Sequence, residues 1–90
     1  MAEFNTGGLA KSLAGHDKNE LYVVTGRNGN YVCLSDGRHH PLGRQKRKNP
    51  KHLQVISNYD EAFGSRLAQG LVRDEEIRRV IRTAKQQEGI

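Results

Sequence analysis

The residues of this sequence best suited to chemistry are six lysines and arginines crowded between positions 38 and 52. The chain has 15 Lys and Arg against 10 Asp and Glu in 90 residues, a formal net charge of +5. The segment RHHPLGRQKRKNPKH (38–52), called the basic segment below, contains no acidic residue, so the positive excess lies there. A block of this density predicts contact with a polyanion. The alternative is a flexible basic loop or a localisation tag.

The side chains of the basic segment differ in how they would contact phosphates. Three guanidinium groups can each hold two phosphate oxygens or stack on an unpaired base: Arg38, Arg44 and Arg47. Three ammonium groups act as point charges: Lys46, Lys48 and Lys51. Pro41 and Pro50 restrict the backbone of a predicted loop, which lowers the entropic cost of ordering it on a ligand. With roughly four to six phosphate contacts, log affinity should fall against log salt with a slope near −3 to −5.

The other reactive side chains do not form the pattern of a catalytic or metal site. Cys33 is the only cysteine, which excludes an internal disulfide and a cysteine-built zinc site. The four histidines do not follow a zinc-binding spacing: His16, His39, His40 and His52. Neutral imidazoles are better suited to hydrogen-bond or stack on a ligand, and His52 is included among the predicted contacts. We therefore predict no catalytic residue, no metal and no cofactor.

The elements that must position the basic segment have the composition of short strands. Apolar and β-branched runs at 21–25, 31–34 and 53–56 are separated by turn residues, and 8–15 is predicted to be a further strand. Asn28-Gly29 is typical of a tight hairpin, and Asp36-Gly37 gives a second hairpin signal. Several short strands in about fifty residues predict a mainly β fold whose small sheet closes into a barrel.

From Asp60 onward the pattern changes to helices. Asp60 is predicted to cap a helix over 61–69 that ends at Gly70. Asp74 is predicted to cap a second helix, whose apolar residues form one stripe: Ile77, Val80, Ile81 and Ala84. Arg78, Arg79, Arg82 and Lys85 lie off this stripe. Tyr59 is predicted to pack between the strand region and the helices.

The chain is therefore divided into a disordered N-terminus (1–5), a β domain (6–58) that includes the basic segment as a loop, and a C-terminal helical segment (59–90). With 34% hydrophobic residues, 90 residues support one modest core and leave little room for an enzyme's substrate cavity. No apolar run approaches the roughly 20 residues that cross a bilayer, and no signal peptide is recognised. We expect a cytoplasmic protein without a membrane partner.

A further motif lies at Gly8 and in the segment Gly15-His16-Asp17-Lys18-Asn19-Glu20, followed by an apolar strand. This pattern resembles the KOW motif, with Asn19 and Glu20 where glycine and a basic residue are usual. Asn accepts a left-handed backbone, so the first departure is tolerable. With the second hairpin and the basic segment, the chain resembles small bacterial KOW-domain RNA-binding proteins, themselves similar to KOW-bearing large-subunit ribosomal proteins of archaea and eukaryotes.

The resemblance implies an SH3-like β-barrel whose loops contact structured RNA, in particular ribosomal RNA, with Lys18 as a second contact point. Gly8, Gly15 and Gly29 are predicted to serve backbone conformation. Asp17 is predicted to orient its loop by accepting backbone N–H groups in an Asx turn.

Two alternatives accompany the RNA-binding interpretation. Tyr22 and Tyr31 would serve as base-stacking platforms if exposed, although both lie in apolar strands where core packing is commoner. Alternatively, the chain would be a protein-interaction adaptor that uses an SH3-like barrel and the apolar stripe of the second helix to bind a protein partner.

Overall fold

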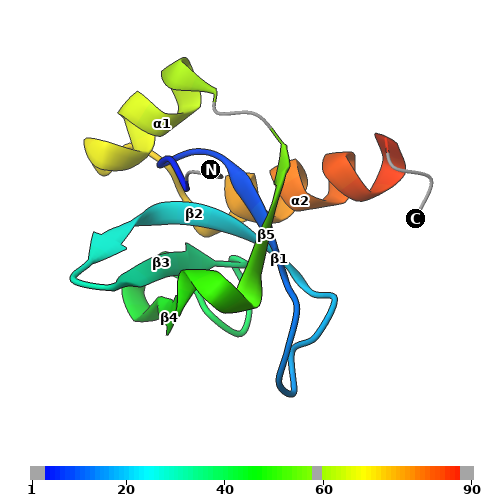
Figure 1. Cartoon of the computed structure of the whole chain (residues 1–90). Coiled ribbons are helices and arrows are strands. Elements are labelled where there is room, and N and C mark those ends of the chain that lie inside the picture. The colour runs from blue at the N-terminus through cyan, green and yellow to red at the C-terminus, as the bar shows by residue number, and fades with distance from the viewer. Residues whose placement is uncertain (1–3, 58–59, 88–90) are drawn as a thin grey trace.

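The computed structural model describes residues 4–57 and 60–87 and shows one antiparallel sheet with two helices beside it (Figure 1). The sheet has five strands in the order β4-β3-β2-β1-β5. Their bounds are Leu9–Ser12 for β1, Leu21–Asn28 for β2, Tyr31–Ser35 for β3, Lys46–Lys48 for β4 and Leu53–Ser57 for β5. The mainly β prediction is confirmed. The predicted domain boundary at 58/59 and the packing role of Tyr59 fall outside the described residues.

Strand β2 is buried on both faces, because the sheet supports a core on each side. Leu21 and Val23 face the helices, in a helix-side cluster of Leu9, Leu21, Val23, Phe63, Val72, Ile77, Ile81 and Ala84. Tyr22 and Val24 face the other way, in an inner cluster of Ala10, Tyr22, Val24, Val32, Leu34 and Leu53. Of the N-terminal segment predicted to be disordered, residues 1–3 lie outside the described part, and Phe4 packs against the inner cluster.

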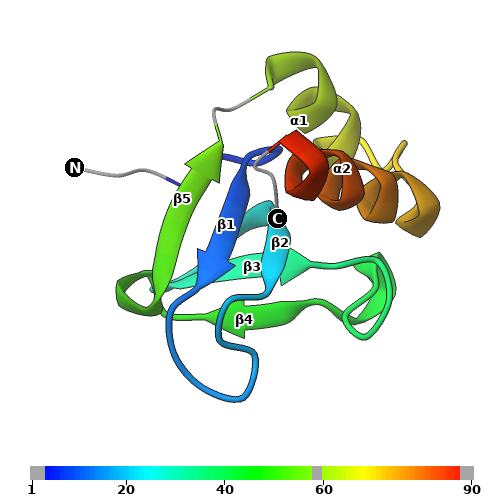
Figure 2. The same ribbon diagram turned by 90° about the vertical axis from the view of Figure 1, so that its right-hand side faces the viewer.

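The sheet bends sharply around the inner cluster but does not close. Figure 2 shows β5 and β1 crossing β3 and β4 at a steep angle, with β2 shared by both halves. The pairing of β2 with β3 shifts register between Val24 and Gly26, and such a bulge bends the strand. Within the described residues β4 pairs only with β3 and β5 only with β1, so the predicted closure of the sheet is not observed.

The strand predictions are confirmed at 21–25, 31–34 and 53–56, and the hairpin at Gly29 joins β2 to β3. Of the strand predicted over 8–15, only 9–12 is a strand, and 13–15 begin the loop to β2. Gly29 has a φ of +62°. Asn30 does not share this left-handed conformation, so the turn needs only one residue with positive φ.

The basic segment was predicted to be a loop, and this prediction is wrong. It contains β4, flanked by two single 3₁₀ turns at Leu42–Arg44 and Pro50–His52. β4 pairs with β3 through Val32, Cys33 and Leu34. The sequence Lys46-Arg47-Lys48 has no apolar residue with which to show an alternating pattern, so its strand conformation depends on backbone pairing with β3.

The two predicted helices are both present, as α1 (Glu61–Ala68) and α2 (Asp74–Gln87). The carboxylate of Asp60 accepts the N–H of Phe63, which confirms the first cap, and Gly70 ends the helix at a φ of +75°. Asp74 is the first residue of α2, and its carboxylate accepts the N–H of Leu42 instead of capping the helix. In the part of the chain that is described, no helix has the length and apolar character needed to cross a membrane.

Candidate nucleic-acid interface

The loop between β1 and β2 (13–20) holds the candidate KOW residues in a compact, hydrogen-bonded conformation. Gly15 and Asn19 both have a left-handed backbone, with φ of +92° and +75°. The N–H of Asn19 donates to the carbonyl of Ser12 over 2.8 Å. Asn19 therefore takes the conformation that glycine would otherwise supply, as predicted. Gly8 is not left-handed; a Cβ there would lie 3.2 Å from the carbonyl oxygen of Asn5.

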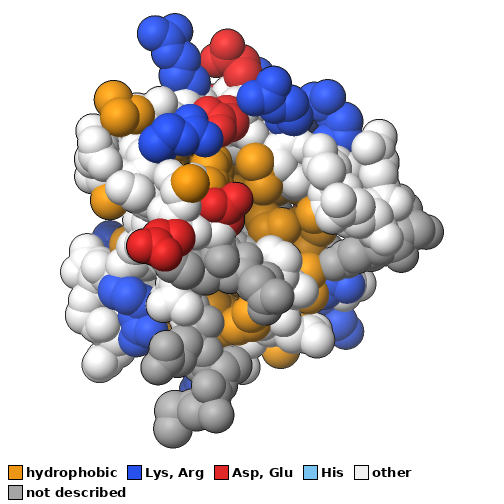
Figure 3. Space-filling view, turned by 90° about the horizontal axis from the view of Figure 1, so that it is seen from above, with side chains coloured by type: hydrophobic (Ala, Val, Ile, Leu, Met, Phe, Trp, Pro, Cys, Tyr) orange, Lys and Arg blue, Asp and Glu red, His pale blue; other side chains and the backbone are white. Residues whose placement is uncertain are grey.

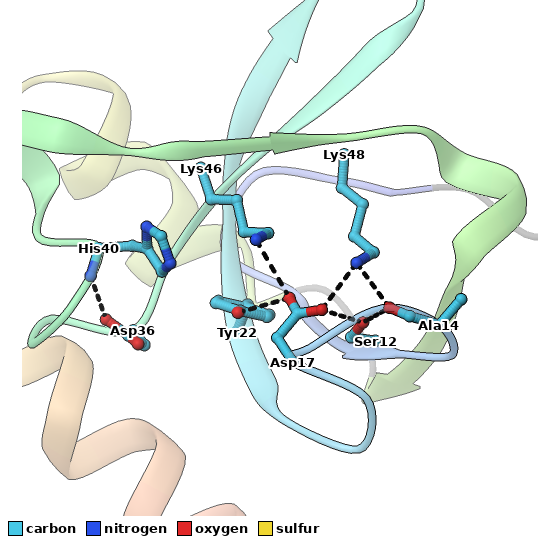
Figure 4. Close-up of polar contacts among 8 residues, drawn as sticks. All are labelled: Ser12, Ala14, Asp17, Tyr22, Asp36, His40, Lys46 and Lys48. Carbon is cyan, nitrogen blue, oxygen red and sulfur yellow. Dashed lines mark hydrogen bonds and ion pairs between the residues drawn. The ribbon is translucent and has the colours of Figure 1, made fainter.

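The carboxylate of Asp17 is the centre of a polar cluster under this loop (Figure 4). Oδ1 accepts hydrogen bonds from Ser12 Oγ at 2.9 Å and from Lys48 Nζ at 2.8 Å. Oδ2 accepts from Tyr22 Oη at 2.7 Å and lies 3.5 Å from Lys46 Nζ. Lys48 Nζ also donates to the carbonyl of Ala14 at 2.9 Å. One carboxylate thus joins the β1–β2 loop to β2 and to the basic strand β4.

These contacts determine the ionisation of the cluster. Partial burial opposes ionisation of Asp17, but hydrogen bonds from Lys48, Tyr22 and Ser12 outweigh it and hold the pKa well below the usual range. Burial, followed by the hydrogen bond to Asp17, raises the pKa of the Tyr22 phenol. Asp17 therefore remains charged and Tyr22 remains a hydrogen-bond donor at any physiological pH.

The predicted Asx turn at Asp17 is wrong in its partners. The side-chain donors to Asp17 are a serine, a tyrosine and a lysine, and the turn of its own loop is closed by backbone bonds, including Glu20 N–H to the Asp17 carbonyl at 2.9 Å. The donors come from outside its own turn: Ser12 and Tyr22 lie five positions away, and Lys48 comes from β4. No local pattern pairs Lys48 with Asp17, because the two residues are 31 positions apart.

The structure divides the predicted phosphate contacts into two groups. Lys46 and Lys48 lie opposite Leu34 and Val32, on the inner face of the sheet, and both ammonium groups face Asp17. Arg47 alternates to the outer face, opposite Cys33. The exposed members of the predicted set are Lys18, Arg38, Arg44, Arg47 and Lys51. His52 is half-buried, and its carbonyl accepts the N–H of Leu13.

The two candidate stacking tyrosines have different environments. Tyr22 is only 2% exposed, which confirms its predicted place in the core. Tyr31 is 49% exposed, so the preference for core packing is wrong at this position. Tyr31 shares the outer face of β3 with the half-buried Cys33, whereas Val32 between them faces the inner cluster.

The connection between β3 and β4 is anchored on helix α2. Gly37, with a φ of +72°, comes so close to the helix that a Cβ there would lie 2.5 Å from the carbonyl oxygen of Asp74. Arg78 Nη1 donates to the carbonyl of Gly37 at 2.6 Å, and the N–H of Leu42 donates to Asp74 at 2.8 Å. Asp36-Gly37, predicted to be a hairpin turn, begins the connection between the antiparallel strands β3 and β4. This connection is longer than a tight turn and also docks on the helix.

This docking creates a cleft of about 640 Å³ between α2, the β1–β2 loop and the β3–β4 connection. Its lining includes five Lys and Arg side chains: Arg38, Lys46, Arg78, Arg82 and Lys85. In the sequence, the helix cations are recognisable only as residues off the apolar stripe. Their spacing on one flank of an amphipathic helix was visible, but the partner surface across from them was not.

The apolar stripe of α2 packs inside the protein. Ile77, Ile81 and Ala84 are buried in the helix-side cluster, and Val80 packs against it. A hollow of about 490 Å³ remains between α2 and β5, lined in part by Ile56, Val80 and Arg79. Figure 3, which views the molecule from above Figure 1, shows hydrophobic side chains in the middle of this face, with both acidic and basic side chains around them. The stripe therefore serves mainly as a packing face, which removes most of the interface that the adaptor hypothesis required.

Comparison with known proteins gives no family assignment. Neither a family model nor a curated protein matches this chain. Within residues 4–57 and 60–87, no group of three or more His, Cys, Asp or Glu side chains is placed to hold a metal ion. The function is therefore inferred from the charges and geometry described above.

Proposed function

We propose that this chain is a non-catalytic RNA-binding module of the KOW type, which docks on ribosomal or another structured RNA in the cytoplasm. The contacts are the exposed cations of the basic segment, together with Lys18 on the β1–β2 loop.

The observation that carries this proposal is the way Asp17 separates the cations into structural and exposed ones. Lys46 and Lys48 are held on the inner face by Asp17. Arg38, Arg44, Arg47 and Lys51 are exposed on a segment without an acidic residue. Because β4 and its flanking 3₁₀ turns are ordered, Arg44, Arg47 and Lys51 are presented at little entropic cost. The backbone at Arg38 is held by its N–H, which donates to Asp36.

Phosphates are the ligand chemistry that best matches this surface. Exposed Lys and Arg gain affinity for nucleic acid by releasing condensed counterions, whatever the base sequence. Of the two candidate stacking tyrosines only Tyr31 is accessible, so the surface is better suited to a folded RNA backbone than to a row of unstacked bases.

The SH3-like barrel belongs to this proposal. It is supported by the antiparallel order, with β1 between β2 and β5, by the steep bend at Gly26 and by the 3₁₀ turn that connects β4 to β5. The open edge between β4 and β5 makes the barrel an incomplete one.

The test is binding of a fluorescent RNA hairpin while the salt concentration is raised. The four exposed cations of the basic segment and Lys18 predict a slope of log affinity against log salt of about −4. The double variant that carries both Arg44→Glu and Arg47→Glu should weaken binding by about tenfold or more. It should also reduce the magnitude of the salt slope by about 1.5.

The matched control carries the same change of charge on the helical side, Arg73→Glu with Arg79→Glu, both of which are exposed. Equal loss in both variants would contradict specific contact through the basic segment. A strong preference for duplex DNA, or binding only to a protein, would overturn the proposed function. Cosedimentation with ribosomal subunits in a gentle gradient identifies the RNA as ribosomal.

A further inference from the structure

The cleft beside α2 is a built feature of the fold. One wall is the β3–β4 connection, which is fixed to the helix by the Arg78 and Asp74 hydrogen bonds and by the close approach at Gly37. The floor includes the buried side chains of Leu21, Tyr22 and Ile81. The other wall is the β1–β2 loop, which is held by Asp17.

The cleft lining carries five Lys and Arg side chains against three acidic ones, a formal excess of two positive charges. Of the three acidic residues, Asp17 is engaged by Lys46, Lys48, Tyr22 and Ser12. Asp36 accepts the N–H groups of Arg38 and His40 at 2.9 and 2.8 Å, which lower its pKa although partial burial opposes this. Glu20 is the third. Among the five cations, Lys46 is paired with Asp17 and Arg78 bonds the Gly37 carbonyl. Arg38, Arg82 and Lys85 are the exposed ones.

We infer that this cleft is a second RNA-contact site, which holds a stretch of phosphodiester backbone between α2 and the β3–β4 connection. The inference rests on the proposed function and extends it to residues outside the basic segment. RNA is the ligand we infer for the cleft because the cleft is continuous with the basic segment. Arg38 is exposed and belongs both to the basic segment and to the cleft lining, so one RNA that contacts the basic segment can continue past Arg38 onto α2.

The helix contributes the part of this site that the sequence pattern did not reveal. Arg78, Arg82 and Lys85 line the cleft, whereas Arg79 lines the apolar hollow on the opposite flank of α2. Positions 78, 82 and 85 are spaced by four and three residues and therefore share one helix face. Arg78 is committed to the Gly37 carbonyl, so Arg82 and Lys85 are the two helix cations best placed to contact phosphates.

The test uses the same fluorescent RNA hairpin and two double variants. The cleft variant carries Arg82→Glu and Lys85→Glu, and the control variant carries Arg73→Glu and Arg79→Glu. We expect the cleft variant to lose about tenfold or more in affinity and about 1.5 in the magnitude of the salt slope, and the control to stay within about threefold of the wild type. All four positions are exposed, and unchanged urea midpoints will verify the fold.

A second measurement does not depend on variants. When the RNA hairpin is titrated into the wild-type chain, amide resonances of residues 36–40 and 78–85 should shift together with those of 44–51.

The outcomes separate the two proposals. If the cleft variant binds like its control while the double variant of Arg44 and Arg47 loses affinity, the cleft inference is overturned and the proposed function stands. If the wild-type chain does not bind the hairpin or ribosomal RNA, both are overturned. If 36–40 and 78–85 do not shift while 44–51 do, the cleft is likewise excluded as a contact.

Discussion

At the scale of single residues, Asp17 explains most of how the candidate interface is organised. Its carboxylate accepts three side-chain hydrogen bonds and lies next to a second ammonium group. Because the side chain is only 13% exposed, removal of its charge would leave Lys48, which is equally buried, without its main partner. Charge-assisted hydrogen bonds in such surroundings contribute more than those on an open surface.

We expect Asp17→Asn to lower the free energy of unfolding by about 2–3 kcal/mol at pH 7. Urea denaturation measures this change. Lys18→Ala, in the same loop but exposed, should remain within about 0.5 kcal/mol of the wild type. A loss below about 0.5 kcal/mol for Asp17→Asn would show that the cluster is not important for stability.

The same residue predicts how stability depends on pH. The folded-state pKa values of Asp17 and Asp36 are lowered, so the unfolded chain binds more protons in acid. This contribution is complete above the unfolded pKa of about 3.9 and is lost as the pH falls towards the folded pKa. The unfolding free energy of the wild type should therefore decrease below about pH 5, and that of Asp17→Asn should decrease less. Parallel pH profiles for the two proteins would contradict the assignment.

At the scale of elements, contacts between segments decide what the turn residues do. Gly29 and Gly37 both have positive φ, at +62° and +72°, and both follow residues typical of hairpins. A Cβ on Gly29 would meet no atom within 4 Å, whereas on Gly37 it would collide with the backbone of α2. One glycine therefore serves only the turn, and the other also permits the helix to dock.

This contrast predicts different costs for the same substitution. Gly29→Ala should destabilise by about 1 kcal/mol, the cost of a left-handed backbone. Gly37→Ala adds a steric clash and should destabilise by about 2–4 kcal/mol. Thermal or urea unfolding of the pair tests this difference, and Gly26→Ala, where a Cβ also meets no atom within 4 Å, serves as the control. Equal effects at 29 and 37 would contradict the docking of the β3–β4 connection on α2.

At the scale of the whole molecule, helix α2 is an integral part of the fold. Ile77 is fully buried in the helix-side cluster, which also contains Leu9, Leu21 and Val23 from the sheet. A chain of this size buries only a small hydrophobic core, so loss of packing at the helix should destabilise the entire structure.

Accordingly, Ile77→Ala should reduce the free energy of unfolding by about 2–5 kcal/mol and keep a single cooperative transition. Leu71→Ala is the matched apolar truncation at a side chain that is 61% exposed, and it should change stability by less than about 1 kcal/mol. Circular dichroism during urea unfolding provides both values. A separate, earlier loss of helix signal would show that α2 unfolds independently of the sheet.

The sequence by itself determined the local structure and the sign of the surface charge. Short apolar and β-branched runs bounded by turn residues predicted β1, β2, β3 and β5. The capping and spacing at Asp60 and Ile77 predicted the helices. Both signals depend on neighbours a few positions apart. The concentration of cations at 38–52 was likewise a property of composition.

The tertiary structure alone decided which cations are exposed and what lies opposite them. β4 has no apolar alternation and forms only by pairing with β3, and Lys48 is engaged because the fold brings Asp17 to it from 31 positions away. The closeness of Arg82 and Lys85 to Arg38 depends on the docking of α2 at Gly37. Such long-range contacts produce no periodic pattern in the sequence, because the geometry of the folded chain determines which residues meet.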